Sequence, residues 1–378
     1  MDIVTVARRI ADDVLFPAAL ATDGSDTVPR ELLDVLADAG LYGIAAPADA
    51  GGLDADFGVM CAVLETLASG CLTTAFVWLQ HHGLVRAVAG GDRPELREKW
   101  LAPLASGAVR AGLAGGGMLR QAPLRARPSG DGWLLDGESP FVSGWGRVDV
   151  LHVGARTPDD QIVWLIVDAA EGPALRVNRL RLAALNATAT VTVTFRGLPV
   201  PADRVTGIHP ANGGTPPVVL RLHAALALGV AARCRRLLGP APVDAELAAL
   251  RAELDELGPG TAAARAAAGE LAVRAAAAVM TTEGSRSLLA PGHAERLMRE
   301  AGFTLVYALR PESKAALLAR LGATDHPPTA ARLPEARGWS AGVTRERSGE
   351  GGLAPVTACC CWRGAGSRCR RPRCRSVR

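Results

Sequence analysis

The stretch TATVTVTF occupies residues 188–195, and threonine takes every second position in it. The positions between hold alanine, two valines and phenylalanine. Because successive side chains of a strand point to opposite faces, this alternation predicts a strand with one buried face. The sequence on both sides of this region has the period of helices. The stretch therefore sets the plan of the protein, a β region between two helical regions.

The β region extends outward from this strand. Residues 132–155 also alternate, and Asp136-Gly137 within them predicts a hairpin turn. The short apolar run at residues 162–167 predicts a further strand. Residues 109–208 are therefore expected to form a middle domain, a small antiparallel β-barrel or sandwich.

Helical spacing of apolar residues marks the region before the strands. Five helices are expected there, over residues 3–15, 29–39, 56–68, 72–89 and 94–105. Residues 1–108 form the predicted N-terminal helical domain.

The helical period returns after Gly214. Five more helices are expected, over residues 218–238, 241–257, 261–283, 292–309 and 311–321. Residues 209–322 form the predicted C-terminal helical domain, a helical bundle. Helices, then strands, then helices indicate an α+β fold with segregated elements.

Residues 323–378 have no apolar period and hold 11 Arg, 4 acidic residues and five of the eight cysteines. Such a segment buries too little apolar surface to offset the entropy of ordering, so a disordered tail is expected. Its cysteines lack the Cys-x2-Cys spacing of a zinc site, which disfavours a metal- or nucleic-acid-binding arm. The alternative is a natural frame that ends near Ala323, with the rest never selected as protein.

The charge and the cysteines exclude several classes of protein. The tail contributes +7 to the formal net charge of +4, which leaves the body at −3 and gives no reason to expect nucleic acid as a partner. Cys61, Cys71 and Cys234 lie in apolar, helix-like stretches, which is typical of free thiols in a reducing compartment. No apolar run is long enough for a membrane span, and the N-terminus does not resemble a signal peptide. We therefore expect a cytoplasmic protein without a metal site.

Five segments, in order along residues 1–321, together resemble the acyl-CoA dehydrogenase family. They are GLYGI with the following GGL (40–44 and 51–53), WLAPLASG (100–107), GWLLDG with FVSG (132–137 and 141–144), VPADRV (200–205) and ERLMREA (295–301). The resemblance implies a flavoprotein that binds FAD, acts on an acyl-CoA thioester and assembles as a homodimer or homotetramer. In that chemistry a carboxylate base removes the α-proton, and the β-hydrogen leaves as hydride to the flavin.

The resemblance also implies cofactor-binding residues. Phe141, Val142 and Ser143 stand where the family has W-I-T/S, whose hydroxyl binds the flavin and whose aromatic ring flanks it. Read without the resemblance, Phe141 is a core residue and Ser143 a turn residue. Arg235 stands at the arginine of the family's R-x-Q-F-G, which holds the FAD adenylate across a subunit interface.

Departures from the family pattern fall on the residues that perform the chemistry. Residues 112–118, GLAGGGM, replace the T-E-P-x-A-G-S-D segment, and residues 235–239, RRLLG, lack the Gln and Phe of R-x-Q-F-G. The Gly-Gly-x-Gly-Tyr turn is reduced to EGSR at residues 283–286.

The catalytic carboxylate is missing as well. Ala308 stands at the position of the family's catalytic glutamate. The alternative position for the base, on the first helix after the β domain, falls at Val219 or Leu220. Glu312 is the nearest acid, but it lies in a first helical turn, where the helix dipole explains it.

The remaining polar residues have structural explanations. One of His81 and His82 is expected to be buried and the other exposed, and His223 reads as a core histidine rather than a base. Arg296 and Arg299 are expected to pair with Glu295 and Glu300 on a solvated or interface face.

Three hypotheses for function follow. The first is an FAD-dependent α,β-dehydrogenation of an acyl thioester. The second is a non-catalytic scaffold or partner protein on this fold. The third is a flavin-dependent oxygenase, which needs no base for an α-proton.

Overall fold

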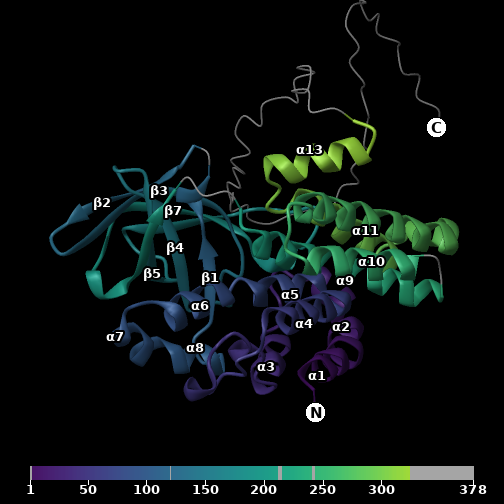
Figure 1. Cartoon of the computed structure of the whole chain (residues 1–378), viewed down its shortest axis with the longest axis horizontal. Coiled ribbons are helices and arrows are strands. Elements are labelled where there is room, and N and C mark those ends of the chain that lie inside the picture. Colours follow the sequence, from purple (N-terminus) through teal and green to yellow (C-terminus); the bar gives the residue numbers. More distant parts are fainter. Residues whose placement is uncertain (1, 120, 212–214, 241–242, 324–378) are drawn as a thin grey trace, which may run out of the picture. The chain divides into compact units, whose positions relative to one another are not determined.

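Helices precede and follow one eight-stranded sheet (Figure 1). The computed structural model describes residues 2–119, 121–211, 215–240 and 243–323. The described residues pack as one unit, and the division at residues 108 and 208 stays a prediction. The expected disorder of the tail falls on residues 324–378, outside the described part of the chain.

The N-terminal region is helical, as the apolar spacing predicts. Its longer elements are α1 (Ile3–Arg9), α2 (Phe16–Asp23), α3 (Arg30–Asp38), α4 (Phe57–Gly70), α5 (Leu72–Leu79), α6 (His82–Gly90), α7 (Pro94–Leu96) and α8 (Ala102–Ser106). The π-helical segments η1 (Ile10–Leu15) and η4 (Arg97–Leu101) join α1 to α2 and α7 to α8. The helix predicted over residues 72–89 is two helices. Gln80 and His81 between them bond to carbonyls only three residues back, which tightens the chain into a turn.

The middle region is a mixed sheet, so the predicted antiparallel barrel or sandwich is wrong. Its strands are β1 (Ala111–Ala114), β2 (Leu124–Ser129), β3 (Gly132–Val142), β4 (Val150–Arg156), β5 (Gln161–Asp168), β6 (Leu175–Arg179), β7 (Val191–Val200) and β8 (Val205–Pro210). Their order is β6-β7-β3-β2-β4-β5-β8, with β1 paired to β4. The β1–β4 and β2–β4 pairs are parallel, and the sheet does not close into a barrel. Alternation along one strand carries no information about the direction of its neighbour.

The hairpin predicted at Asp136-Gly137 is also wrong, because β3 runs straight through both residues. The turn lies between β2 and β3, at Gly130-Asp131. Gly137 serves a close approach between backbones. It has φ +112°, and a Cβ atom on it would lie 2.0 Å from the carbonyl oxygen of Pro123. Gly137, which the sequence analysis took as part of a turn, is therefore required inside a strand, where another backbone comes close.

The C-terminal region is helical, and its elements match the predicted ranges closely. They are α9 (Pro217–Leu238), α10 (Val243–Asp255), α11 (Thr261–Glu283), α12 (His293–Val306) and α13 (Pro311–Arg320). By length and composition α9 is the one described helix that could cross a membrane, but 67% of its apolar window is buried inside the protein. Such burial is typical of a core helix.

The two helical regions share a core, and α4 packs closely on α9. A Cβ atom at Gly229 would lie 2.5 Å from the carbonyl oxygen of Glu65. Arg233 of α9 donates from Nη2 to Asp12 at 2.6 Å, which ties α9 to η1. Cys61, Cys71 and Cys234 are buried free thiols, as expected.

Candidate functional site

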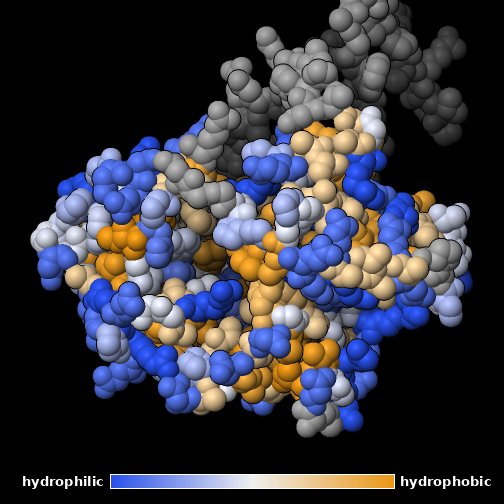
Figure 2. All heavy atoms as spheres, viewed as in Figure 1, coloured by the Kyte–Doolittle hydropathy of each residue, from blue (hydrophilic) through white to orange (hydrophobic). Residues whose placement is uncertain are grey.

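Helix α5 is the element on which the segments singled out in the sequence converge. On one side, the end of β3 reaches it, since a Cβ atom at Gly144 would lie 3.4 Å from Cγ1 of Val77. On another side, the Phe76 ring meets the Phe303 and Tyr307 rings edge-on, at centroid distances of 5.0 and 4.7 Å. Tyr307 directly precedes Ala308, the position of the missing base. The predicted flavin strand and the predicted base segment thus contact one helix. Hydrophobic residues gather on this face between the sheet and the C-terminal helices (Figure 2).

The three strand-end residues differ in their exposure to solvent. Phe141 is 69% exposed, whereas Val142 and Ser143 are buried. Phe141 also has φ +56°, an unusual conformation for a bulky residue. The ring is therefore not a core residue. It is held where a ligand at the strand end can cover it.

Ser143 begins a chain of three buried hydroxyl groups. Its Oγ lies 2.7 Å from Oγ1 of Thr190, which lies 2.7 Å from Oγ1 of Thr188. The Thr188 hydroxyl donates to the carbonyl oxygen of Leu185, so Thr190 must donate to Thr188, and Ser143 must donate to Thr190. Among the described residues no group donates to the Ser143 oxygen, which can therefore accept a hydrogen bond from a ligand.

An aromatic cluster lies on the other side of α5. Its members are Phe76, Gln80, His223, Phe303 and Tyr307. The Phe303 and Tyr307 rings stack, and the His223 ring of α9 meets Tyr307 edge-on at 5.0 Å. The cluster therefore brings α5, α9 and α12 together at the two places where the family positions its base.

Burial and two nearby positive charges determine the protonation state of His223. Burial lowers its pKa to about 3, and the charges of Arg265 and Arg310 lower it further, so the ring is neutral at pH 7. Its Nδ1 atom has no hydrogen-bond partner among the described residues. Arg265 is buried and donates to the carbonyl oxygens of Thr304 and Tyr307 at 2.7 and 3.1 Å. No described carboxylate pairs with either arginine.

The candidate positions for a base hold no acid. Ala308 has φ +47°, and Leu220 is buried in α9. Glu312 is exposed in the first turn of α13, as the helix-dipole explanation requires. His223 is the ionisable side chain of the cluster with an unpartnered nitrogen, and the sequence analysis set it aside as a core histidine. The available signal was its spacing of four residues, one helical turn, from Val219.

The glycine-rich segment at residues 112–118 packs on the sheet. A Cβ atom at Gly116 would lie 2.4 Å from the carbonyl oxygen of Glu138, and one at Gly117 would lie 2.5 Å from the backbone nitrogen of Arg156. The Gly116 N–H also donates to Oγ of Ser139. Close contact between backbones therefore explains these glycines.

Arg235 lies in a groove between helices, with a volume of about 520 Å³. No described contact joins it to the strand end. The lining residues come from α1, η1, α4, α9 and α10, and the charged ones are Arg8, Asp12, Glu65, Arg235, Arg236, Asp244 and Arg251. Arg235 forms an ion pair with Asp244. We call this cavity the arginine groove.

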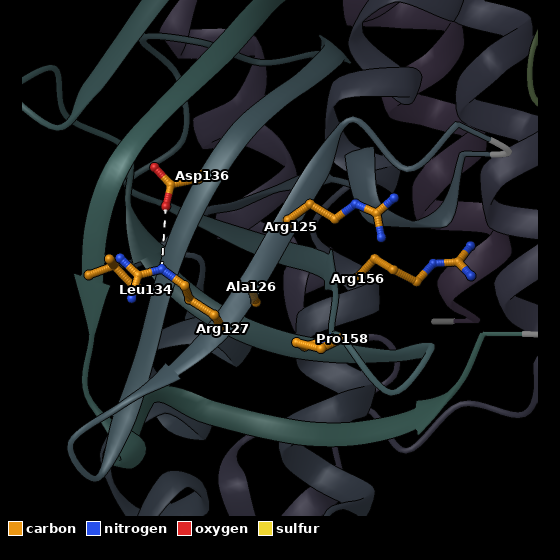
Figure 3. A pocket seen from close by; sticks show the side chains of 7 residues that line it. All are labelled: Arg125, Ala126, Arg127, Leu134, Asp136, Arg156 and Pro158. Atoms are coloured by element: carbon orange, nitrogen blue, oxygen red, sulfur yellow. Dashed lines mark ion pairs between the residues drawn. The ribbon is translucent and has the colours of Figure 1, made fainter.

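A second cavity, of about 300 Å³, lies on the sheet surface (Figure 3). Arg127 pairs with Asp136 across it at 4.0 Å, and Arg125 and Arg156 stand at paired positions of β2 and β4. Leu134 and Asp136 of the GWLLDG segment line it, but none of the predicted cofactor-binding residues does.

The residues present fit one end of FAD and not the other. The exposed Phe141 ring and the free lone pairs of Ser143 fit the edge of a flavin ring. The adenylate end needs donors and positive charge for phosphate, whereas Arg235 already gives its Nε–H to Asp244 and faces the negative charge of that carboxylate.

Comparisons with known proteins confirm the resemblance that the five segments predict. Residues 2–108 match the family model for the acyl-CoA dehydrogenase N-terminal domain. Cyclohex-1-ene-1-carbonyl-CoA dehydrogenase of Syntrophus aciditrophicus is 27% identical over 162 residues, which cover 41% of this chain and 39% of that protein. The match thus spans less than half of that relative's length.

Solved structures share the fold over most of the chain. The glutaryl-coenzyme A dehydrogenase in complex with glutaryl-CoA has a TM-score of 0.71 at 19% identity, covering 85% of this chain and 94% of that one. Dibenzothiophene monooxygenase from Paenibacillus sp. A11-2 has a TM-score of 0.69 at 17% identity, covering 85% and 97%. At these identities the likeness concerns the fold alone.

Proposed function

We propose that this chain is a divergent member of the acyl-CoA dehydrogenase family and a flavin-dependent oxidoreductase that acts on an acyl thioester. One observation carries the proposal. The end of β3, with Phe141 exposed, and the segment before Ala308 both contact α5. A flavin and a substrate held against these segments would be neighbours. A cytoplasmic location and a homodimeric or homotetrameric assembly are part of the proposal.

The bound flavin would supply the two-electron chemistry. Phe141 would cover one face or edge of the flavin ring, and Ser143 would accept a hydrogen bond from it. The aromatic cluster would exclude water from the acyl group, which strengthens every charge interaction inside the site.

His223 is the residue that we propose as proton acceptor in an α,β-dehydrogenation. Its neutral ring has a free nitrogen, but a pKa of about 3 makes it a weak base. Negative charge that develops on the thioester oxygen would raise that pKa, and the charges of Arg265 and Arg310 would stabilise the enolate.

A flavin-dependent monooxygenase is the second candidate. The absence of a described carboxylate from the aromatic cluster favours it, because oxygen transfer needs no removal of an α-proton. Dibenzothiophene monooxygenase, whose fold is similar to that of this chain, is a monooxygenase by name.

The first test is the absorbance spectrum of the purified full chain, titrated with FAD. We expect stoichiometric flavin bands, and about tenfold weaker binding in Phe141→Ala from lost ring contacts. Leu289→Ala is the matched control, since Leu289 is also 69% exposed. A folded chain that holds no flavin at saturating FAD would leave only the scaffold hypothesis.

The second test separates the two reactions. Turnover of an acyl-CoA panel with an artificial electron acceptor, lost in His223→Gln with flavin still bound, would support dehydrogenation. Product formation that needs oxygen and reduced flavin, and that survives His223→Gln, would support the oxygenase.

A further inference from the structure

The ion pairs of the arginine groove join helices to one another, so the arginines in these pairs already face carboxylates of this chain. We propose that the chain binds a flavin through its ring end alone, so that FMN and FAD bind with nearly equal affinity. The inference rests on the proposed function, because it assumes a flavin at the end of β3.

FAD differs from FMN by its adenylate half, which adds a second phosphate to the first. A protein that prefers FAD must offer free donors to that half, and arginine is the residue whose planar fork suits a phosphate. The resemblance assigns this role to Arg235, acting from a second copy of the chain.

The paired arginines of the groove are already bound to carboxylates. Arg235 pairs with Asp244 of α10. Arg236 donates from Nη1 to both oxygens of Asp12, at 2.8 and 3.0 Å. On the facing side, Arg251 donates from Nη2 to Glu65 at 2.5 Å.

These pairs have a structural purpose. Asp12 lies in η1 and Glu65 in α4, so the Arg236–Asp12 and Arg251–Glu65 pairs tie C-terminal helices to the N-terminal region, whereas Arg235–Asp244 joins α9 to α10. Arg233, one turn before Arg236, repeats the arrangement by donating to Asp12 and to the carbonyl oxygen of Ser69. The guanidinium groups of Arg233 and Arg236 are thus held by several bonds, whereas Arg235 is held by one bond to Asp244.

The charge balance of the groove also disfavours the binding of a diphosphate. Four arginines and three carboxylates line it, an excess of one positive charge, and Arg8 is the lining arginine without a described ion pair, while Arg233 beside the groove shares Asp12 with Arg236. A diphosphate carries about two negative charges and would face the three carboxylates, and like charges brought together oppose binding. The residues after Arg236 add no donor, because Leu237 and Leu238 stand where the family has polar Gln and aromatic Phe.

Calorimetric titration of the full chain with FMN and with FAD tests the inference. We expect the two dissociation constants to agree within about threefold. Asp244→Asn removes the negative charge that faces Arg235 and should tighten FAD by about fivefold while leaving FMN unchanged. Asp13→Asn is the matched control, since Asp13 is exposed beside Asp12 and forms no described ion pair. It should change neither constant.

The other outcomes separate this inference from the proposed function. FAD that binds at least about tenfold more tightly than FMN would overturn the inference and leave the flavoprotein intact. Equal affinities that Asp244→Asn does not disturb would show that Asp244 is not the reason, and would overturn the argument from the groove. A chain that binds neither flavin would end both proposals.

Discussion

Acidification should destabilise this protein through His81, and the structure sets the size of the effect. His81 is buried, and its Nδ1 atom accepts a hydrogen bond from the Ala111 N–H at 3.1 Å. Its Nε2 atom lies 3.1 Å from the carbonyl oxygen of Leu104, to which it must donate. The neutral ring thus joins α8 to β1, and a proton on Nδ1 would break the bond to Ala111.

The sign follows from the direction of the shift. Burial lowers the pKa of His81 to about 3, from an ordinary value of about 6.5. The unfolded chain therefore binds the proton first, and stability is lost as the pH falls below about 6.5, until the folded state titrates as well. The loss is about 1.4 kcal/mol at pH 5.5 and about 2.7 kcal/mol at pH 4.5.

Urea unfolding at pH 7.5 and 5.5 measures the effect. His81→Gln keeps a donor and an acceptor but cannot titrate, so it should lose about 1.4 kcal/mol less between the two pH values than the parent chain. His209→Gln, on an exposed residue of β8, is the control and should stay within about 0.5 kcal/mol of the parent. Equal losses in His81→Gln and in the parent chain would refute the reasoning.

Three further changes should alter stability, each measured by urea unfolding. Gly229→Ala should cost about 1–3 kcal/mol, because its Cβ would enter the α4 backbone, whereas Gly90→Ala, with nothing within 4 Å, should be neutral or stabilising. Equal effects of the two would contradict the close packing. Glu300→Ala should cost about 3–5 kcal/mol, since it leaves the buried Arg296 without the carboxylate now 2.5 Å away, and a change below about 1 kcal/mol would mean that water reaches the pair. Asp56→Ala should cost about 1 kcal/mol by removing the cap of α4, and an unchanged midpoint would show that the cap is not needed.

Several features could be predicted from the sequence because they depend on neighbours along the chain. Apolar spacing places α9 and α11 within a residue or two of their observed ends, and the pairing of Arg296 with Glu300 follows from their spacing of four. The segment matches identify Phe141–Ser143 as a strand end. The spacing of residues along the chain could not predict which of these side chains are buried. The Arg296–Glu300 pair expected on a solvated or interface face lies in the core, and both His81 and His82 are buried.

The candidate site shows the same limit. The sequence analysis took His223 as a core histidine because a lone histidine on a helix usually is one. Its contact with Tyr307 could not be foreseen, because the two residues lie 84 positions apart in the sequence. Arg235 matched a motif letter, but its ion pair with Asp244 depends on how α10 folds back on α9.

The sequence by itself determined the order of helices and strands and the resemblance of the chain to a known family, because periodicity and short motifs are local. The tertiary structure alone decided the mixed direction of the strands in the sheet, the burial of the Arg296–Glu300 pair, the exposure of Phe141 and the ion pair of Arg235 with Asp244. Each of these depends on contacts between residues distant in the chain, where the cost of desolvating a charge or the approach of another backbone sets the outcome.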